Sequence, residues 1–96
     1  MRVKLMADYG AFPLWGPGGE LAPDALPLPP WLVAALRDWA DEHDRLLGPA
    51  FEWPSEEAKA AFVAGGRRLF HRVRAELGPG YQVVYFNEIT GRVEER

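Results

Sequence analysis

The sequence contains no cysteine, a single serine, a single threonine and no long apolar run. Without cysteine the chain cannot form disulfides, thiolate zinc sites or iron–sulfur clusters. Because serine and threonine are so scarce, covalent hydrolase chemistry has little to use. We predict no catalytic residue, no metal site and no cofactor. No apolar run approaches the ~20 residues of a membrane span. We therefore expect a cytoplasmic protein that does not enter the membrane.

The residues that are present are sufficient for a hydrophobic core. Of the 96 residues, 48% are hydrophobic and 12% are aromatic, and the net charge is only -3. These values are typical of a folded chain rather than a disordered one. A chain of this length is too short for two cores, so residues 1–96 are predicted to form a single domain.

Three segments have patterns typical of β-strands. Val3 and Leu5 are apolar side chains at alternate positions, which predicts a strand over residues 2–7 with one buried face. Residues 81–87 are rich in β-branched and aromatic side chains, which predicts a central strand. Its face with Phe86 would be exposed in a monomer, which raises the expectation of a homodimer. Residues 92–95 are predicted to form a short charged edge strand.

Two segments are predicted to be amphipathic helices. Over residues 31–47 the apolar positions recur at intervals of three and four, and Gly48 marks the end of this helix. Residues 56–77 contain a second apolar stripe, and Ser55 is a suitable N-cap.

A pair of glycines, Gly65 and Gly66, lies inside the second predicted helix. Two glycines at such positions cost about 2 kcal/mol relative to alanines. We therefore expect either a kink in the helix or, preferably, a groove against which Trp39 or a loop packs.

The segment at residues 8–30 holds six of the nine prolines and four of the ten glycines. This density predicts a long loop without helix or strand. Asp8 begins it, and Tyr9, Phe12 and Trp15 follow at intervals of three. These aromatic side chains are predicted either to cover the core as a lid or to form a recognition surface for a partner.

The predicted elements have the order βααββ. The simplest arrangement is an α+β fold, a two-layer sandwich in which two helices cover one face of a small, mainly antiparallel sheet. The Pro/Gly-rich loop follows the first strand.

Charge is unevenly distributed along the predicted helices. Residues 37–58 carry a net charge of -5, and residues 59–77 carry +4. Arg67, His71 and Arg74 share one side of the second helix, where they either bind a phosphate or an acidic partner or merely stabilise the helix C-terminus. The net negative charge of the whole chain disfavours nucleic-acid binding.

His43 lies on the apolar stripe of the first helix. Two interpretations are open. A histidine at such a position is commonly a boundary residue with a hydrogen-bond partner, and it is also the best acid–base candidate in the chain.

Two stretches of the sequence resemble a group of small uncharacterised bacterial proteins. One is KLMADYG at residues 4–10 with PLW at 13–15, and the other is ELG at 76–78 followed by Tyr81, Val83, Tyr85 and Phe86. The resemblance covers most of the chain. It implies a small bacterial protein and assigns no activity, cofactor or site residue.

Two functions remain open from the sequence. The favoured one is a non-enzymatic module of the immunity, antitoxin or regulatory type that binds another protein through the aromatic loop and one charged pole. The alternative is a small-molecule-binding protein or modest enzyme with a pocket between the loop and the helices, in which Asp8, His43 and an arginine act.

Overall fold

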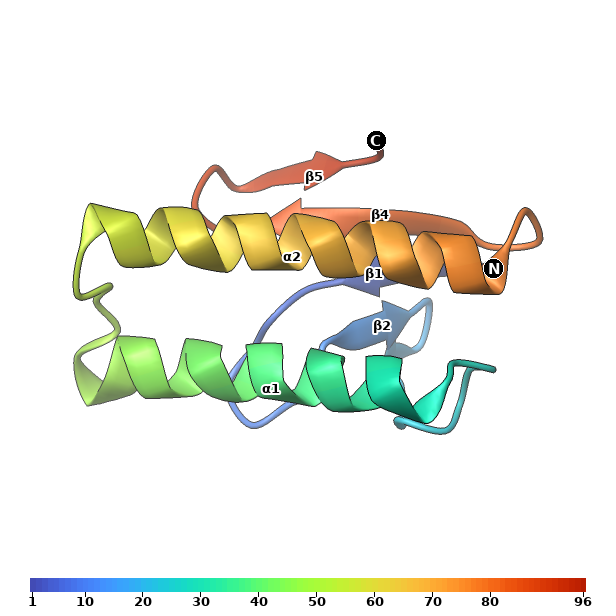
Figure 1. The fold of residues 1–96 in the computed structure, drawn as a ribbon, viewed down its shortest axis with the longest axis horizontal. Coiled ribbons are helices and arrows are strands. Elements are labelled where there is room, and N and C mark those ends of the chain that lie inside the picture. The colour runs from blue at the N-terminus through green and yellow to red at the C-terminus, as the bar shows by residue number, and fades with distance from the viewer.

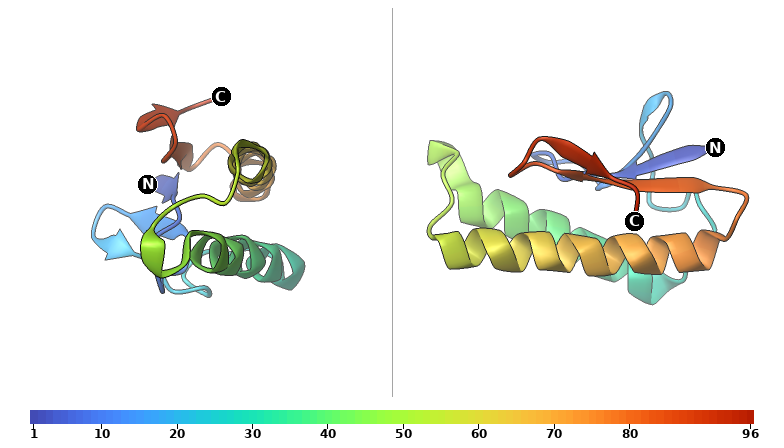
Figure 2. Two further views of the ribbon diagram at one scale, coloured as in Figure 1. Left: turned by 90° about the vertical axis from the view of Figure 1, so that its left-hand side faces the viewer. Right: turned by 90° about the horizontal axis from the view of Figure 1, so that it is seen from above.

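In a computed structural model, residues 1–96 form a mixed five-stranded sheet and two long helices. Helices α1 (Pro30–Leu47) and α2 (Glu56–Leu77) run antiparallel on the same side of the sheet (Figures 1 and 2). A short 3-10 helix, η1 (Gly48–Ala50), begins the connection between them. The α+β class predicted from the sequence is therefore confirmed. Neither helix has the length and apolar character needed to cross a membrane.

The sheet has the strand order β3-β2-β1-β4-β5. Strands β1 (Arg2–Leu5) and β4 (Gln82–Asn87) pair in parallel, and the other three pairings are antiparallel. The parallel pairing requires a long crossover, which the two helices provide between β1 and β4. Strand β4 lies between β1 and β5 (Arg92–Glu94), so both of its edges are paired.

The prediction of a loop without strands over residues 8–30 is wrong, because the segment contains a β-hairpin. Strand β2 (Leu14–Gly16) pairs with β1, and β3 (Gly19–Glu20) pairs back with β2. The prolines permit this pairing because Pro13 and Pro17 flank β2 instead of interrupting it. Gly19 turns the chain with a φ of 120°, which other residues rarely adopt. The element order is consequently βββααββ rather than βααββ.

Three of the four predicted helix ends are confirmed. The Ser55 hydroxyl accepts a hydrogen bond from the amide of Ala58 at 3.0 Å, and Gly48 and Gly78 follow the last helical residues with positive φ. Helix α2 has the predicted bounds, and α1 begins one residue earlier than predicted. The three predicted strands are each one or two residues shorter in the structure.

The core lies between the sheet and the helices. At Gly66, the backbone of α2 packs closely against Trp39 of α1 and Tyr85 of β4. A Cβ atom there would lie 2.7 Å from the Tyr85 hydroxyl and 2.8 Å from Cζ2 of Trp39. The Trp39 ring stacks on Phe62 with centroids 4.4 Å apart, and its Nε1 donates to the Phe62 carbonyl at 3.0 Å. The glycine pair therefore leaves a groove for Trp39, and the preferred prediction is confirmed. The buried cluster consists of Val3, Leu5, Phe12, Leu14, Leu26, Leu32, Leu36, Trp39, Phe62, Val63, Phe70, Val73, Val83 and Tyr85.

The sheet face turned away from the helices is partly covered by its own side chains. Val84 is fully buried, and Phe86 is half-buried with the Lys4 ammonium 6.0 Å from its ring centroid. Val93, opposite Phe86 on β5, remains exposed. The Phe86 face is thus less open than the sequence implies, and a homodimer through this face stays a prediction.

Replacing Gly66 by alanine is expected to destabilise the protein by about 1–3 kcal/mol, because the added methyl group would overlap Trp39 and Tyr85. Gly65→Ala is the matched control: its Cβ would lie 3.4 Å from Cδ1 of Trp39, and alanine favours the helix by about 1 kcal/mol. Chemical denaturation followed by circular dichroism compares the two variants. Equal stabilities would contradict a groove specific to Gly66.

Candidate functional site

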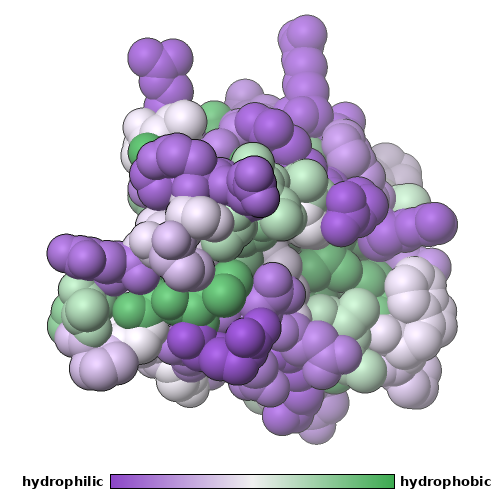
Figure 3. Space-filling view, turned by 60° about the vertical axis from the view of Figure 1, so that its left-hand side comes forward, coloured by the Kyte–Doolittle hydropathy of each residue, from purple (hydrophilic) through white to green (hydrophobic).

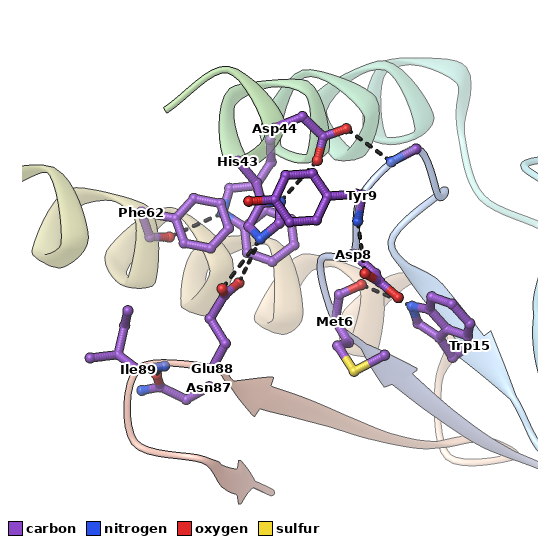
Figure 4. Close-up of polar contacts among 12 residues, drawn as sticks. Met6, Asp8, Tyr9, Trp15, His43, Asp44, Phe62, Asn87, Glu88 and Ile89 are labelled. Atoms are coloured by element: carbon purple, nitrogen blue, oxygen red, sulfur yellow. Dashed lines mark hydrogen bonds and ion pairs between the residues drawn. The ribbon is translucent and has the colours of Figure 1, made fainter. Parts of the chain in front are cut away.

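His43 is buried between two carboxylates that come from different parts of the chain. The apolar stripe of α1 directs its ring toward the sheet, and the residue is 2% exposed. Its Nδ1 lies 2.9 Å from Oδ1 of Asp44, and its Nε2 lies 3.1 Å from Oε1 of Glu88, at the end of β4 (Figure 4). Of the two interpretations from the sequence, the geometry fits a buried histidine with hydrogen-bond partners.

Aromatic rings surround the His43 imidazole. The ring centroid of Tyr9 lies 5.1 Å away, that of Phe62 5.5 Å and that of Trp53 6.1 Å. Tyr9 in turn contacts Phe51 edge-on, with centroids 5.2 Å apart. The imidazole is thus shielded from water by rings from the β1–β2 loop (residues 6–13), the α1–α2 connection and α2.

Asp44 also positions the β1–β2 loop. Its Oδ2 accepts a hydrogen bond from the amide of Gly10 at 3.0 Å, while its Oδ1 contacts His43. Asp8 acts locally, because its carboxylate accepts the amide of Tyr9 at 2.8 Å. The carboxylates that contact His43 are therefore Asp44 and Glu88 rather than Asp8.

The surroundings of His43 change its proton affinity. Burial by itself lowers the pKa, but the hydrogen bonds and negative charges of Glu88 and Asp44 outweigh burial, so the pKa of His43 is raised. The same carboxylates act on Tyr9, where desolvation first and the charges of Asp44 and Glu88 second raise the pKa of the phenol. Both shifts favour the protonated forms.

Exposed apolar side chains lie next to these carboxylates. Tyr9 is 40% exposed, Phe51 70% and Ile89 39%. We call the surface formed by Tyr9, Phe51, Ile89, Asp44 and Glu88 the acidic–aromatic end. Figure 3 turns this end of the molecule toward the viewer, with apolar atoms flanked by charged side chains.

The backbone at Phe51 is unusual. Phe51 is the one residue other than glycine with a positive φ, at 55°. An aromatic residue in the left-handed region is strained, and such strain often occurs at functional surfaces. The α1–α2 connection thus presents a large apolar side chain to solvent from a conformation that most residues avoid.

The other two aromatic residues of the predicted recognition loop lie elsewhere. Phe12 is buried in the core cluster, where it covers the sheet as the lid interpretation expects. Trp15 is half-buried on the outer sheet face, and its Nε1 donates to the carbonyl of Met6 at 2.9 Å. The structure therefore separates Tyr9 from Phe12 and Trp15.

The basic ridge on α2 contacts the C-terminal strand. Arg67 donates two hydrogen bonds of 2.9 Å to the carboxylate of Glu94 on β5. These bonds are the first cause of the lowered pKa of Glu94. Arg74 donates to the carbonyl of Glu95 at 3.3 Å, and His71 is exposed beside Phe70. Arg67 and Arg74 thus bind the C-terminal segment rather than His43, so the sequence-predicted residues divide between two sets of contacts.

Sequence reasoning missed four residues of the acidic–aromatic end: Asp44, Phe51, Glu88 and Ile89. Asp44 was within reach of such reasoning, because it directly follows His43. Glu88 was not, because its contact with His43 spans 45 residues.

The polar groups around His43 do not form a ligand pocket. A hollow of about 150 Å³ lies between the β1–β2 loop and α1, and its lining includes Asp41 and Asp44 but not His43. Ligand sites are usually about 300–1,000 Å³. No three His, Asp or Glu side chains are grouped to hold a metal ion.

The His43 contacts predict a specific dependence of stability on pH. Because the folded pKa is raised above the unfolded value of about 6.5, His43 contributes stability that is fully present below about pH 6.5 and is lost as pH rises through the folded pKa. Urea denaturation at a series of pH values is expected to show this decline in the wild type and in His71→Gln. His43→Gln should lack it, and an unchanged decline in that variant would contradict the assignment.

Comparison with known proteins identifies the family of the chain. The chain matches the family model described as Serratia CdiI immunity protein-like over residues 1–88. The matched range includes both helices, β1 to β4, and the acidic–aromatic end except Ile89, together with the two stretches that carry the resemblance to small bacterial proteins. No curated protein matches the chain. The chain belongs to the Serratia CdiI immunity protein-like family.

Proposed function

We propose that this chain is an immunity protein that binds a toxin protein directly through the acidic–aromatic end. The observation that carries the proposal is the contact between Tyr9 and Phe51, two exposed aromatic rings that lie beside the carboxylates of Asp44 and Glu88. The family supports binding to a protein partner. A cytoplasmic site of action is part of the proposal.

The exposed aromatic pair is well suited to contribute binding energy. Burial of a phenylalanine side chain contributes about 1.5–3 kcal/mol, and aromatic residues are common among those that dominate protein interfaces. Phe51 is 70% exposed in the isolated chain, so most of its surface is available for burial against a partner. Tyr9 packs against both Phe51 and His43, which limits the entropy lost when it binds.

The charge of this end indicates the chemistry of the partner surface. Residues 37–58, which include the C-terminal half of α1 and the α1–α2 connection, carry a net charge of -5. A toxin surface with exposed lysine or arginine around an apolar centre would be complementary. Such complementarity accelerates association and makes the association rate depend on salt concentration.

The alternative function, a small-molecule-binding protein or enzyme, has less support. Both ring nitrogens of His43 already contact carboxylates, and the ring is buried, so the imidazole is not available as a general base. The chain's one serine, Ser55, accepts a hydrogen bond as the N-cap of α2.

Phe51→Ala and Tyr9→Ala are each expected to weaken toxin binding by roughly 30-fold or more, as expected for a loss of at least about 2 kcal/mol at an aromatic residue that dominates an interface. Trp31→Ala is the matched control, because Trp31 is also an exposed aromatic residue, 54% exposed, but lies at the opposite end of α1.

The toxin for this test is identified by function. Proteins encoded beside this chain are expressed singly in a bacterial host, and the toxin is the one whose growth arrest the wild-type chain relieves. Its affinity for each purified variant is then measured by calorimetry. Wild-type affinity in both Phe51→Ala and Tyr9→Ala, or an equal loss in Trp31→Ala, would reject this surface. Melting temperatures separate a loss of contact from a loss of folding.

A further inference from the structure

His43 contacts every segment that forms the acidic–aromatic end. The charged or titratable groups that face it are Asp44 from α1, Glu88 from the β4–β5 turn (residues 88–91) and Tyr9 from the β1–β2 loop. The α1–α2 connection and α2 contribute the uncharged rings of Trp53 and Phe62. Figure 4 shows the imidazole among the side chains of Tyr9, Asp44, Phe62 and Glu88.

The number of donors on the imidazole determines whether these contacts can coexist. Carboxylate oxygens lie 2.9 Å from Nδ1 and 3.1 Å from Nε2. A carboxylate only accepts hydrogen bonds, and a neutral imidazole has a single N–H group. The neutral ring could therefore donate to Asp44 or to Glu88, and its other nitrogen would place a lone pair against a carboxylate oxygen. Both contacts are favourable together only in the imidazolium form.

Each of the two carboxylates connects His43 to a different part of the surface. Asp44 accepts the Gly10 amide and so fixes the loop that carries Tyr9. Glu88 directly precedes Ile89 in the β4–β5 turn. Loss of the proton on His43 would thus remove one of the two contacts through which the imidazole links these segments.

We propose that the protonated His43 is a positioning residue that fixes the β1–β2 loop and the β4–β5 turn relative to each other, so that the binding competence of the acidic–aromatic end declines as pH rises. The effect on binding rests on the proposed function, whereas the effect on the two segments does not. The direction follows from the carboxylates: they favour the protonated ring, which is populated at lower pH.

The proposal is tested by nuclear magnetic resonance on the isolated chain between about pH 6 and about pH 9, a range that contains the expected titration. The imidazole signals of His43 are followed together with the backbone amides of Gly10 and Ile89. All three are expected to shift with one midpoint, above the ordinary imidazole pKa of about 6.5. Amides of Gly10 and Ile89 that do not shift with the His43 imidazole would overturn the proposal.

Three variants separate His43 from other causes. In His43→Gln the common titration of Gly10 and Ile89 is expected to disappear, and in His71→Gln it is expected to remain. Glu88→Gln removes one of the two charges and keeps the size of the side chain, so the His43 midpoint is expected to fall. This variant keeps the test decisive if His43→Gln fails to fold. A persistent titration in folded His43→Gln, or an unchanged midpoint in Glu88→Gln, would reject the role of His43.

Failure of this inference is distinguishable from failure of the proposed function. If the amides titrate with His43 but Tyr9→Ala and Phe51→Ala bind the toxin normally, His43 positions the two segments and the toxin binds elsewhere. If those variants lose toxin binding but the amides do not titrate with His43, the surface is correct and the positioning role is wrong. Support for both the proposed function and the positioning role requires a specific result. The affinity of the wild type for the toxin must fall severalfold as pH rises through the His43 titration, and the affinity of His43→Gln must not.

Discussion

The close approach of α2 to β4 at Gly66 is the constraint on which the rest of the structure depends. Trp39 and Tyr85 occupy the space that a side chain at this position would fill, so α1, α2 and β4 meet at one point. His43 lies one helical turn after Trp39, and Glu88 lies three residues after Tyr85. The packing at Gly66 therefore also sets the distance between the imidazole and the carboxylate at the end of β4.

Charges on the helical pair are used in different ways. On α2, Arg67 at the middle of the helix binds Glu94, and Arg74 in the last turn reaches the backbone of Glu95. These contacts connect the short strand β5 to the helix. At the acidic–aromatic end, carboxylates and apolar rings remain partly exposed next to each other. Asp44 and Glu88 contact His43 yet stay partly exposed beside apolar rings, and we therefore place the partner surface at the acidic–aromatic end.

A protein that must recognise another protein needs exposed groups in defined positions. In this chain the exposed ring of Tyr9 contacts both the exposed ring of Phe51 and a buried imidazole, whose two nitrogens contact carboxylates from separate segments. Buried polar contacts of this kind restrict the arrangements that neighbouring loops can adopt. Membership of an immunity protein-like family accords with the proposal that this surface binds a protein partner.

Short-range patterns in the sequence determined the class of fold, the limits of α2 and the presence of β1, β4 and β5, because caps and hydrophobic periodicity act over a few residues. They also marked Tyr9 and His43 as candidate binding residues, and they predicted that Trp39 or a loop packs in a groove at the glycine pair. Only the tertiary structure decided that the proline-rich segment forms a hairpin, that Phe12 enters the core, and that Glu88 meets His43. Those outcomes depend on packing between residues that are far apart in the chain. The local preference of a residue does not specify which distant residue it will contact.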